Sequence, residues 1–334
     1  MILITGASGL VGRWLVEAFA DAGHPVQAMV RRPPVRALSP LAEVVQGDLL
    51  DLPRLRELCR GVDAVVHAAG MVRLAGGGRR AMRRVNVEGT ANILAAAQAE
   101  GVGWFGHVSS VAALGQPTPT DRANTGQPLW IDETAMWQAG TDTTPYARTK
   151  YEAEREVWRA AAEGLPVCVV NPSVVLAPEE RSSGQLVRYA WEERRYYPPG
   201  HVNYVDVRDV AEIVRRLYER HTQHQRFIVS AGAVSYQELF ARMATLMDRR
   251  PPPARLTPGV GALAWRADKI RTLVTRTPRR VSRSMLQRFG RQDHFDAGKV
   301  RRHLAYEFRP LEETLAWVCR EWRANYAPPA PISP

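Results

Sequence analysis

The sequence is poor in cysteine. Its three cysteines, Cys59, Cys168 and Cys319, are too far apart for the paired spacing of a zinc motif, and their odd number does not suit a disulfide framework. We therefore expect no metal site. A reducing compartment, the cytoplasm, is the expected location.

Long apolar runs are also missing. None approaches the roughly 18 to 20 residues that a membrane-spanning helix needs. The N-terminal residues MILIT show no basic region followed by an apolar one, so no secretory signal is expected. The composition, 45% hydrophobic and 24% charged, is that of an ordinary soluble protein, and 334 residues can bury a large core and form two domains.

Lysine is almost absent. Only Lys150, Lys269 and Lys299 occur among 45 lysine and arginine residues, so nearly every cation is an arginine. Lys150 lies four residues after Tyr146. A lysine in this chain is therefore a candidate for a chemical role that arginine cannot fill.

What is present, over the first 175 residues, is an alternation of short apolar runs with helical patterns. The runs lack a polar face, which is typical of parallel strands buried on both sides, and the alternation favours an α/β fold with a doubly wound parallel sheet. The predicted strands are residues 1–5, 26–30, 42–48, 64–69, 104–110 and 167–172. The predicted helices are residues 12–23, 52–60, 85–101 and 146–164.

The pattern loosens after Pro172. A proline-rich run, 249–259, interrupts any helix and marks a boundary, and the tail 327–334 is predicted to be disordered. Further elements are predicted at 202–220 (strand, then helix), 227–232 (strand), 235–247 (helix) and 311–326 (helix).

Three glycines, Gly6, Gly9 and Gly12, stand between the first predicted strand and the first predicted helix. Glycines there permit a tight turn and let backbone N–H groups approach a pyrophosphate, whose charge is favoured at a helix N-terminus. The spacing GxxGxxG is one residue longer between the first two glycines than the usual dinucleotide fingerprint. We expect a Rossmann-type dinucleotide site.

The end of the second predicted strand indicates which dinucleotide is bound. An acidic residue there would bond the ribose hydroxyls and repel a 2′-phosphate, whereas arginine accommodates that phosphate. Arg31 stands 19 residues after Gly12 and is followed by Arg32. NADP(H) is therefore favoured over NAD(H); the alternative is a solvated basic turn.

Tyr146 and Lys150 share one face of a predicted helix whose N-cap and first turn suit Thr144 and Pro145. A tyrosine with a pKa of about 10 needs roughly 4 kcal/mol to become an acid or base near neutrality. An ammonium about 4 Å away supplies about that much. The pair is predicted to be catalytic, with Lys150 lowering the pKa of Tyr146; the alternative is an exposed helical pair.

Two serines, Ser109 and Ser110, end the fifth predicted strand at the sheet edge where open parallel sheets bind ligands. One of the two hydroxyls could hydrogen-bond a substrate carbonyl while Tyr146 delivers a proton. The residue chemistry leaves open which serine does so.

These motifs together resemble the extended short-chain dehydrogenase/reductase superfamily, also described as the NAD-dependent epimerase/dehydratase family. The likeness covers about residues 1–230 and, more loosely, the last helix. Within it the chain is most similar to the dihydroflavonol reductase and 3-beta-hydroxysteroid dehydrogenase branch, which includes bacterial members named epimerases. The motifs are TGASGLVG (5–12), GDL (47–49), HAAG (67–70), NVEGT (86–90), VSS (108–110), YARTK (146–150), NPSVV (171–175) and YVDVRDVA (204–211).

The resemblance implies a role for each matching position. Tyr146 would be the acid/base, Lys150 would bind the nicotinamide ribose, and Ser110, five residues before Gly115 as is usual in the family, would polarise the carbonyl. The implied cofactor residues, besides Tyr146 and Lys150, are Gly6, Ser8, Gly9, Leu10, Val11, Gly12, Arg31, Arg32, Asp48, Leu49, Ala68, Ala69, Gly70, Asn86, Val108, Pro172 and Ser173.

Two departures from the family bear on the reaction. Sugar-nucleotide epimerases and dehydratases of this superfamily typically carry an acidic residue after the second strand and an arginine before the asparagine and proline of the sixth. Here Arg31 and the phrase VVNPSVV occupy those places. The resemblance therefore implies an NADPH-dependent reductase of a ketone or aldehyde on a fairly apolar molecule, or the reverse alcohol oxidation. The alternatives are an epimerase or dehydratase with tightly bound NAD(P), and a non-catalytic NADP-sensing protein.

The expected organisation follows from these motifs. Residues 1–175, joined by 201–230, are expected to form the NADP-binding domain. Residues 176–200 and 231–326 are expected to form a smaller C-terminal substrate-binding domain. The resemblance also suggests a homodimer through the helix containing Tyr146 and the preceding helix.

The net charge of +11 is concentrated in residues 266–302, where 12 basic residues accompany three acidic ones. This basic segment has three interpretations: a solvated face, a weak contact with an anionic membrane or a phosphate-bearing substrate, or a nucleic-acid surface, which is the least favoured. Leu263, Ile270 and Val274 lie near one face of a predicted helix there, as in an interfacial helix.

Overall fold

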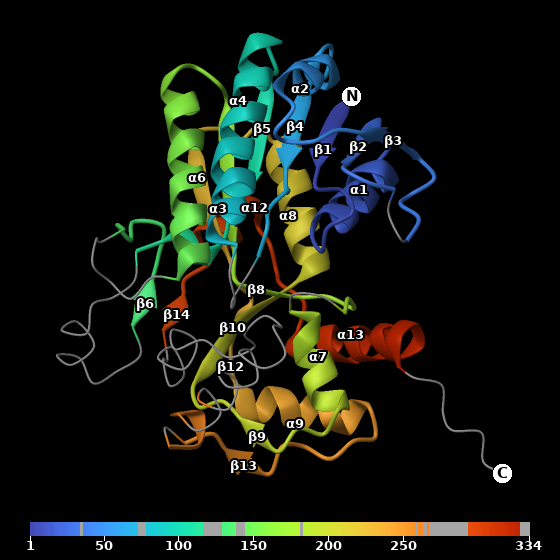
Figure 1. The fold of residues 1–334 in the computed structure, drawn as a ribbon, viewed down its shortest axis with the longest axis vertical. Coiled ribbons are helices and arrows are strands. Elements are labelled where there is room, and N and C mark those ends of the chain that lie inside the picture. The colour runs from blue at the N-terminus through green and yellow to red at the C-terminus, as the bar shows by residue number, and fades with distance from the viewer. Residues whose placement is uncertain are drawn as a thin grey trace.

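The fold is α/β, as predicted (Figure 1). The computed structural model describes residues 1–33, 36–72, 78–115, 129–137, 144–180, 183–257, 259–262, 266 and 293–327. Most of the basic segment, the helix expected around Ile270 and all of the tail after residue 327 lie outside the described residues. None of the helices within the described ranges is both long and apolar enough to cross a membrane.

A seven-stranded parallel sheet forms the centre of the molecule, in the order β11-β7-β5-β4-β1-β2-β3. The inner strands β1, β4, β5 and β7 are buried along their whole length, because helices cover both faces. The strand order reverses between β1 and β4, which is the point where such sheets bind nucleotides. The strands are β1 (Ile2–Thr5), β2 (Val26–Val30), β3 (Ala42–Gln46), β4 (Ala64–His67), β5 (Trp104–Val108), β7 (Val167–Pro172) and β11 (Gln225–Val229).

Helices pack on the two faces of this sheet and form two hydrophobic cores. On one face α1 (Gly12–Asp21), α8 (Val207–Glu219) and α12 (Gly298–Leu304) bury Phe19, Ile213 and Val300 against the strands. On the other face α2 (Leu52–Cys59), α4 (Gly89–Ala99) and α6 (Pro145–Ala162) bury Leu55, Leu94 and Val157. Figure 1 shows α4 and α6 side by side on that second face.

The helix predicted to begin at Val85 begins earlier. A short helix α3 (Arg79–Arg83) runs directly into one π-helical turn, η1 (Arg84–Glu88), and then into α4. Such π-turns are uncommon and often accompany functional sites. This one carries Asn86, which is 2% exposed.

A second, smaller assembly lies below the large sheet in Figure 1. Its three-stranded sheet has the order β12-β10-β8, and α7, α9 and α13 pack into a third core that includes Phe240, Leu315 and Trp322. The elements are β8 (Val174–Leu176), α7 (Gly184–Trp191), β10 (His201–Asp206), β12 (Gly232–Ser235), α9 (Tyr236–Leu246) and α13 (Leu311–Tyr326). Small paired strands complete it: β9 (Tyr196–Tyr197) with β13 (Ala254–Arg255), and β6 (Trp130–Ile131) with β14 (His294–Phe295).

The chain passes back to the large sheet at Asp206. β10 pairs within the small sheet, whereas α8 and β11, which follow it, pack against and join the large one. Asp206 caps α8 by accepting from Arg208 N–H at 2.8 Å, and Thr314 Oγ1 of α13 donates to it at 3.0 Å. The buried Asp206 carboxylate therefore joins the two assemblies at their boundary.

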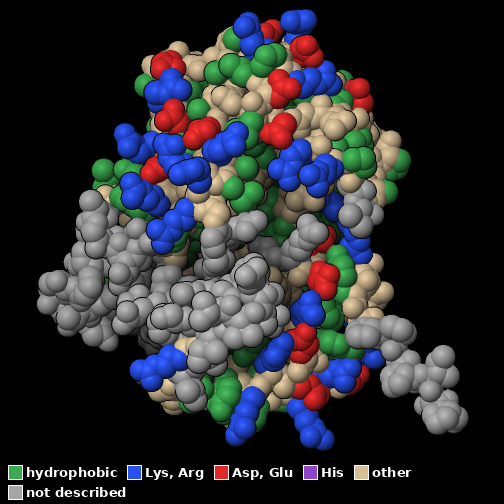
Figure 2. All heavy atoms as spheres, in the orientation of Figure 1, with side chains coloured by type: hydrophobic (Ala, Val, Ile, Leu, Met, Phe, Trp, Pro, Cys, Tyr) green, Lys and Arg blue, Asp and Glu red, His purple; other side chains and the backbone are tan. Residues whose placement is uncertain are grey.

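The described surface is rich in arginine paired with acids. Figure 2 shows Lys and Arg side chains spread over the visible face with Asp and Glu between them. Many are helix neighbours such as Arg148–Glu152 and Arg159–Glu163. Exposed pairs of this kind contribute little to stability.

Candidate active site

The glycine turn between β1 and α1 is packed too tightly for side chains. Gly6 has φ +69°, and a Cβ on it would lie 2.6 Å from the backbone of Ala69. A Cβ on Gly12 would lie 2.0 Å from the Gly6 carbonyl oxygen. The turn is thus held against the end of β4, and no side chain caps the first turn of α1. The N–H groups at the start of α1 are therefore open to a ligand. They are bordered by the exposed Ser8 and Gly9 and by the partly buried Leu10 and Val11. This arrangement fits a pyrophosphate.

Residues expected around the adenosine lie beside this turn. Arg31 and Arg32 follow β2, are exposed, and form no ion pair within the described part of the chain. Leu49 is buried beneath Gly89, and Asn92 Nδ2 donates to its carbonyl at 2.9 Å. Asp48 accepts from the Leu50 N–H at 3.0 Å, which fixes the loop after β3.

The segment after β4 approaches helix α6 through Asn86. Its side-chain oxygen accepts from Met71 N–H at 2.6 Å, and its amide donates to the Met71 carbonyl and to Thr149 Oγ1, both at 3.0 Å. A Cβ on Gly70 would lie 3.6 Å from Asn86 Oδ1 and 4.0 Å from Lys150 Nζ. Gly70 therefore lies beside the lysine, and Ala68 and Ala69 precede it directly after β4.

Ser109 and Ser110 differ in what they contact. Ser109 is 6% exposed and its hydroxyl donates to the Glu154 carboxylate at 2.7 Å. Ser110 caps the short 3-10 helix η2 (Val111–Ala113), and its hydroxyl lies close enough to the phenol of Tyr146 to lower the pKa of that tyrosine. The structure therefore brings Ser110, the serine favoured by the resemblance, to the tyrosine and directs Ser109 into the interior.

Tyr146 and Lys150 occupy the same face of α6, as predicted from their spacing. Thr144 Oγ1 caps the helix by accepting from Ala147 N–H at 3.1 Å, and Pro145 occupies the first turn. Tyr146 is partly exposed, whereas Lys150 is 5% exposed and its Nζ donates to the Val108 carbonyl at 2.9 Å.

The electrostatics of this pair differ from the prediction. Burial raises the pKa of Tyr146, and only the hydrogen bond from Ser110 opposes that rise. The predicted lowering of the Tyr146 pKa by Lys150 is therefore not seen, and the Lys150 ammonium donates to a backbone carbonyl. Burial lowers the pKa of Lys150 itself to about 8, against the attraction of Glu154.

Pro172 and Ser173 continue from β7 at the same edge of the sheet. Ser173 is 7% exposed, its N–H donates to the Val229 carbonyl at 3.0 Å, and its hydroxyl is buried with no hydrogen-bond partner among the described residues. A buried hydroxyl without a partner is uncommon in native proteins. It fits a site where a bound cofactor supplies the missing hydrogen bond.

Sequence reasoning missed the polar groups beneath the site. His67 Nδ1 is 2.7 Å from Thr5 Oγ1 and its Nε2 is 3.0 Å from Thr90 Oγ1. The ring of His107, stacked on that of His67, has no hydrogen-bond partner in the part of the chain that the structure describes. Burial lowers the pKa of His67 to about 3, so the ring is neutral. Of the missed groups, Glu154 had a visible signal, because it lies four residues after Lys150 on the same helix face.

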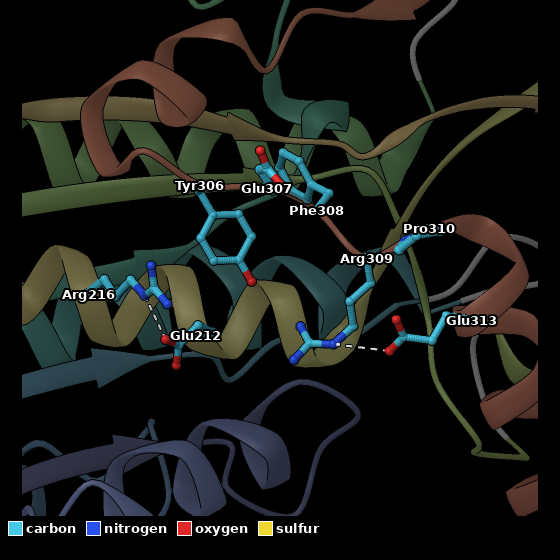
Figure 3. A pocket seen from close by; sticks show the side chains of 8 residues that line it. All are labelled: Glu212, Arg216, Tyr306, Glu307, Phe308, Arg309, Pro310 and Glu313. Atoms are coloured by element: carbon cyan, nitrogen blue, oxygen red, sulfur yellow. Dashed lines mark hydrogen bonds and ion pairs between the residues drawn. The ribbon is translucent and has the colours of Figure 1, made fainter.

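A cavity of about 520 Å³ lies elsewhere, between α8 and the segment that leads into α13 (Figure 3). Its charged groups are largely paired, as in Arg216–Glu212 and Arg309–Glu313. Its lining residues are Glu212, Arg216, Tyr306, Glu307, Phe308, Arg309, Pro310 and Glu313. None of them is among the predicted site residues, so this cavity is separate from the candidate active site.

Similarity to known proteins agrees with this geometry. The chain is 31% identical over 287 residues to sterol demethylase protein B of Methylococcus capsulatus, covering 83% of this chain and 84% of that protein. It is 30% identical over 326 residues, 94% of this chain and 92% of the relative, to a Synechocystis sp. protein provisionally named a dihydroflavonol 4-reductase. The crystal structure of gox2253 superposes with a TM-score of 0.81 at 28% identity and covers 98% of both chains.

A family model also matches more than half of the chain. The model of the NAD dependent epimerase/dehydratase family matches residues 2–230, which include the glycine turn, both serines, Tyr146 and Lys150. This span runs from β1 to the residue after β11, and so takes in the whole large sheet. The chain belongs to the NAD-dependent epimerase/dehydratase family of extended short-chain dehydrogenases/reductases.

Proposed function

We propose that the protein is an NADPH-dependent reductase of a ketone or aldehyde on a fairly apolar molecule. The observation that carries the proposal is the convergence of Ser110, Tyr146 and Lys150 at the edge of the sheet where the glycine turn and Ser173 also lie. A protein that only bound the dinucleotide would have no need of a serine hydroxyl beside this phenol.

Each residue has a distinct task in this reaction. When bound, the dinucleotide supplies the hydride. Ser110 donates a hydrogen bond to the substrate oxygen, and Tyr146 gives up its phenolic proton to the alkoxide. A pKa raised by burial keeps Tyr146 protonated at neutral pH, which suits an acid in the reductive direction. The Lys150 ammonium has three N–H donors, and only one of them reaches Val108, so the others can bond a ribose hydroxyl.

The choice of NADPH rests on Arg31 and Arg32. Both are exposed at the end of β2 and neither is paired within the described residues, so their charge is free for a 2′-phosphate. The test is the ratio of kcat/KM for NADPH to that for NADH. Arg31→Ala should lower that ratio by about tenfold or more, since loss of a charge-assisted hydrogen bond is worth roughly 1.5–3 kcal/mol. An unchanged ratio in the double variant Arg31→Ala, Arg32→Ala would refute the assignment.

The apolar substrate is proposed from the relatives and from the sequence. The similar proteins carry names that refer to a dihydroflavonol and to a sterol, both largely apolar ring systems. The places where sugar-nucleotide enzymes carry an acid and an arginine hold Arg31 and Val170 here. Dimerisation through α4 and α6 and the membrane contact of the basic segment stay predictions.

The deciding experiment is NADPH consumption with a panel of carbonyl compounds, from small aldehydes to ring ketones. Wild-type turnover, lost in Tyr146→Phe and strongly reduced in Lys150→Arg, supports the proposal. NAD(H) retained through purification, with no net consumption of added NADPH, would instead identify an epimerase or dehydratase. Full activity of Lys150→Arg would contradict the role given to the ammonium.

A further inference from the structure

Glu154 is a buried carboxylate beneath the active site with four donors around it. It is 2% exposed and lies on α6 four residues after Lys150. Arg226 of β11 approaches one carboxylate oxygen at 2.5 Å, and Trp158 Nε1 donates to the same oxygen at 3.3 Å. The other oxygen accepts from Ser109 Oγ at 2.7 Å and from Asn171 Nδ2 at 2.9 Å.

These contacts join the strands that carry the reacting groups. Asn171 Nδ2 also donates to the Ser110 carbonyl at 3.0 Å, so the backbone of the catalytic serine is tied to the same cluster. Arg226 donates in addition to the Glu133 carbonyl at 3.3 Å. Helix α6, the ends of β5 and β7, and edge strand β11 therefore meet at one carboxylate.

Four donors around a fully buried carboxylate are the arrangement that an ionised acid needs inside a protein. Replacing a buried ion pair by apolar residues is often neutral or stabilising, so structural stability alone is a weak reason for this cluster. Its position suggests another reason. The nearest charged neighbour on the same helix face is Lys150, whose ammonium is expensive to bury.

We propose that Glu154 is a positioning residue that keeps the Lys150 ammonium charged inside the protein and holds the turn carrying Ser110 in register with it. The effect of Glu154 on catalysis rests on the proposed function, whereas its effect on the charge of Lys150 does not. Arg226 of β11 forms an ion pair with this carboxylate at 2.5 Å, so the charge of Glu154 has a partner inside the protein.

The other titratable groups around Lys150 do not replace this effect. Tyr146 on the same helix and the rings of His67 on β4 and His107 on β5 are neutral near pH 7, because burial lowers the pKa of both histidines and raises that of the tyrosine. Glu154 is then the anion that opposes the loss of the Lys150 proton.

The scarcity of lysine allows a direct test. Protein labelled with [ε-¹³C]lysine contains three lysine signals, and Lys269→Arg and Lys299→Arg assign them. The Lys150 signal should titrate with a midpoint near 8 in the ligand-free wild type. Glu154→Gln, which removes the charge but keeps the shape, should lower that midpoint by about one pH unit, the effect of a charge about 6 Å away at an intermediate dielectric.

The direction of the shift separates an electrostatic role from a structural one. Loosening of the site would admit water and raise the midpoint toward the ordinary value for lysine, whereas loss of the carboxylate lowers it. Glu156→Gln, which removes the same charge from the same helix outside the cluster, should leave the Lys150 midpoint in place. A Lys150 midpoint that rises, or that moves equally in both variants, overturns the inference.

The catalytic consequence is tested on the pH profile of NADPH-dependent reduction. The alkaline limb of kcat/KM should move to lower pH in Glu154→Gln by the same amount as the lysine midpoint. An unmoved limb despite a shifted midpoint overturns the catalytic part of the inference. Absence of turnover in the wild type overturns the proposed function instead, and leaves the lysine titration to decide the inference.

Discussion

Replacing Lys150 with methionine should make the ligand-free protein more stable at pH 7 while removing its activity. The side chain is 5% exposed, and burial lowers its pKa from 10.5 to about 8. Each pKa unit corresponds to about 1.36 kcal/mol, so carrying the ammonium into the fold costs ~3 kcal/mol. Methionine has a similar length and no charge, and it fits irregular space well.

Part of that gain is lost again. The Lys150 ammonium donates to the Val108 carbonyl at 2.9 Å, and removing this hydrogen bond costs ~1 kcal/mol. The expected net stabilisation of Lys150→Met is therefore ~2 kcal/mol at pH 7. This sign is unusual, since most substitutions of buried residues destabilise.

The pH dependence tests the cause of this stabilisation. Below pH 8 the lysine is charged in both states, and the burial cost is fully present. Between pH 8 and 10.5 the unfolded chain binds more protons than the folded one, so wild-type stability rises with pH relative to the variant. The advantage of Lys150→Met should therefore shrink and then reverse by about pH 10, because only the lost hydrogen bond then separates the two proteins.

Urea unfolding at pH 7 and pH 10 measures the difference in free energy of unfolding between the wild type and Lys150→Met. The other titrating groups are common to both proteins, so their contributions cancel in this difference. Arg155→Met, an exposed change on the same helix, should stay within about 0.5 kcal/mol of wild type at both pH values. A destabilised Lys150→Met at pH 7, or a difference that does not depend on pH, would show that the lysine is not a costly buried charge.

Three further predictions concern other contacts. Gly12→Ala should weaken NADPH binding at least about tenfold in a fluorescence titration, because its Cβ would lie 2.0 Å from the Gly6 oxygen although alanine favours helices. Ser110→Ala should lower kcat about 100-fold with cofactor affinity unchanged, whereas Ser109→Ala should mainly lower thermal stability, since it removes a donor from a buried carboxylate. Asp209→Ala should destabilise by about 3 kcal/mol or more in denaturant unfolding, because Tyr306 and Arg309 both bond this fully buried carboxylate.

The large sheet was predictable because its signal is local. Strands such as β1 and β4 are unbroken apolar runs, and they can only be central strands covered on both faces. The spacing of Tyr146 and Lys150 likewise places two side chains on one helix face whatever the rest of the fold does. Glycines at a strand–helix junction carry a similar local constraint, and the turn at Gly6 has the left-handed backbone that requires one.

The parts that escaped prediction depend on contacts between distant segments. Glu154 meets Ser109 across 45 residues of sequence, and β6 meets β14 across a longer stretch still. The π-turn at Asn86 has no clear mark in the sequence, because the same residues suit an ordinary helix. The pKa of Tyr146 was predicted with the wrong sign for a related reason. The helix spacing fixed which face Lys150 occupies, but the position of the Val108 carbonyl decides where its ammonium points.

The direction of the Lys150 ammonium explains why lysine occurs here in a chain whose cationic residues are almost all arginine. The described part of the chain uses lysine twice in the same way: Lys150 Nζ donates to the Val108 carbonyl at 2.9 Å, and Lys299 Nζ to the Arg226 carbonyl at 2.8 Å. A compact ammonium can sit against one backbone oxygen and still aim its other protons at a ligand, whereas a guanidinium presents five donors in a rigid plane. An arginine at position 150 would also hold its charge at every accessible pH, and so would be as costly to bury without offering a pKa near neutrality that Glu154 can adjust.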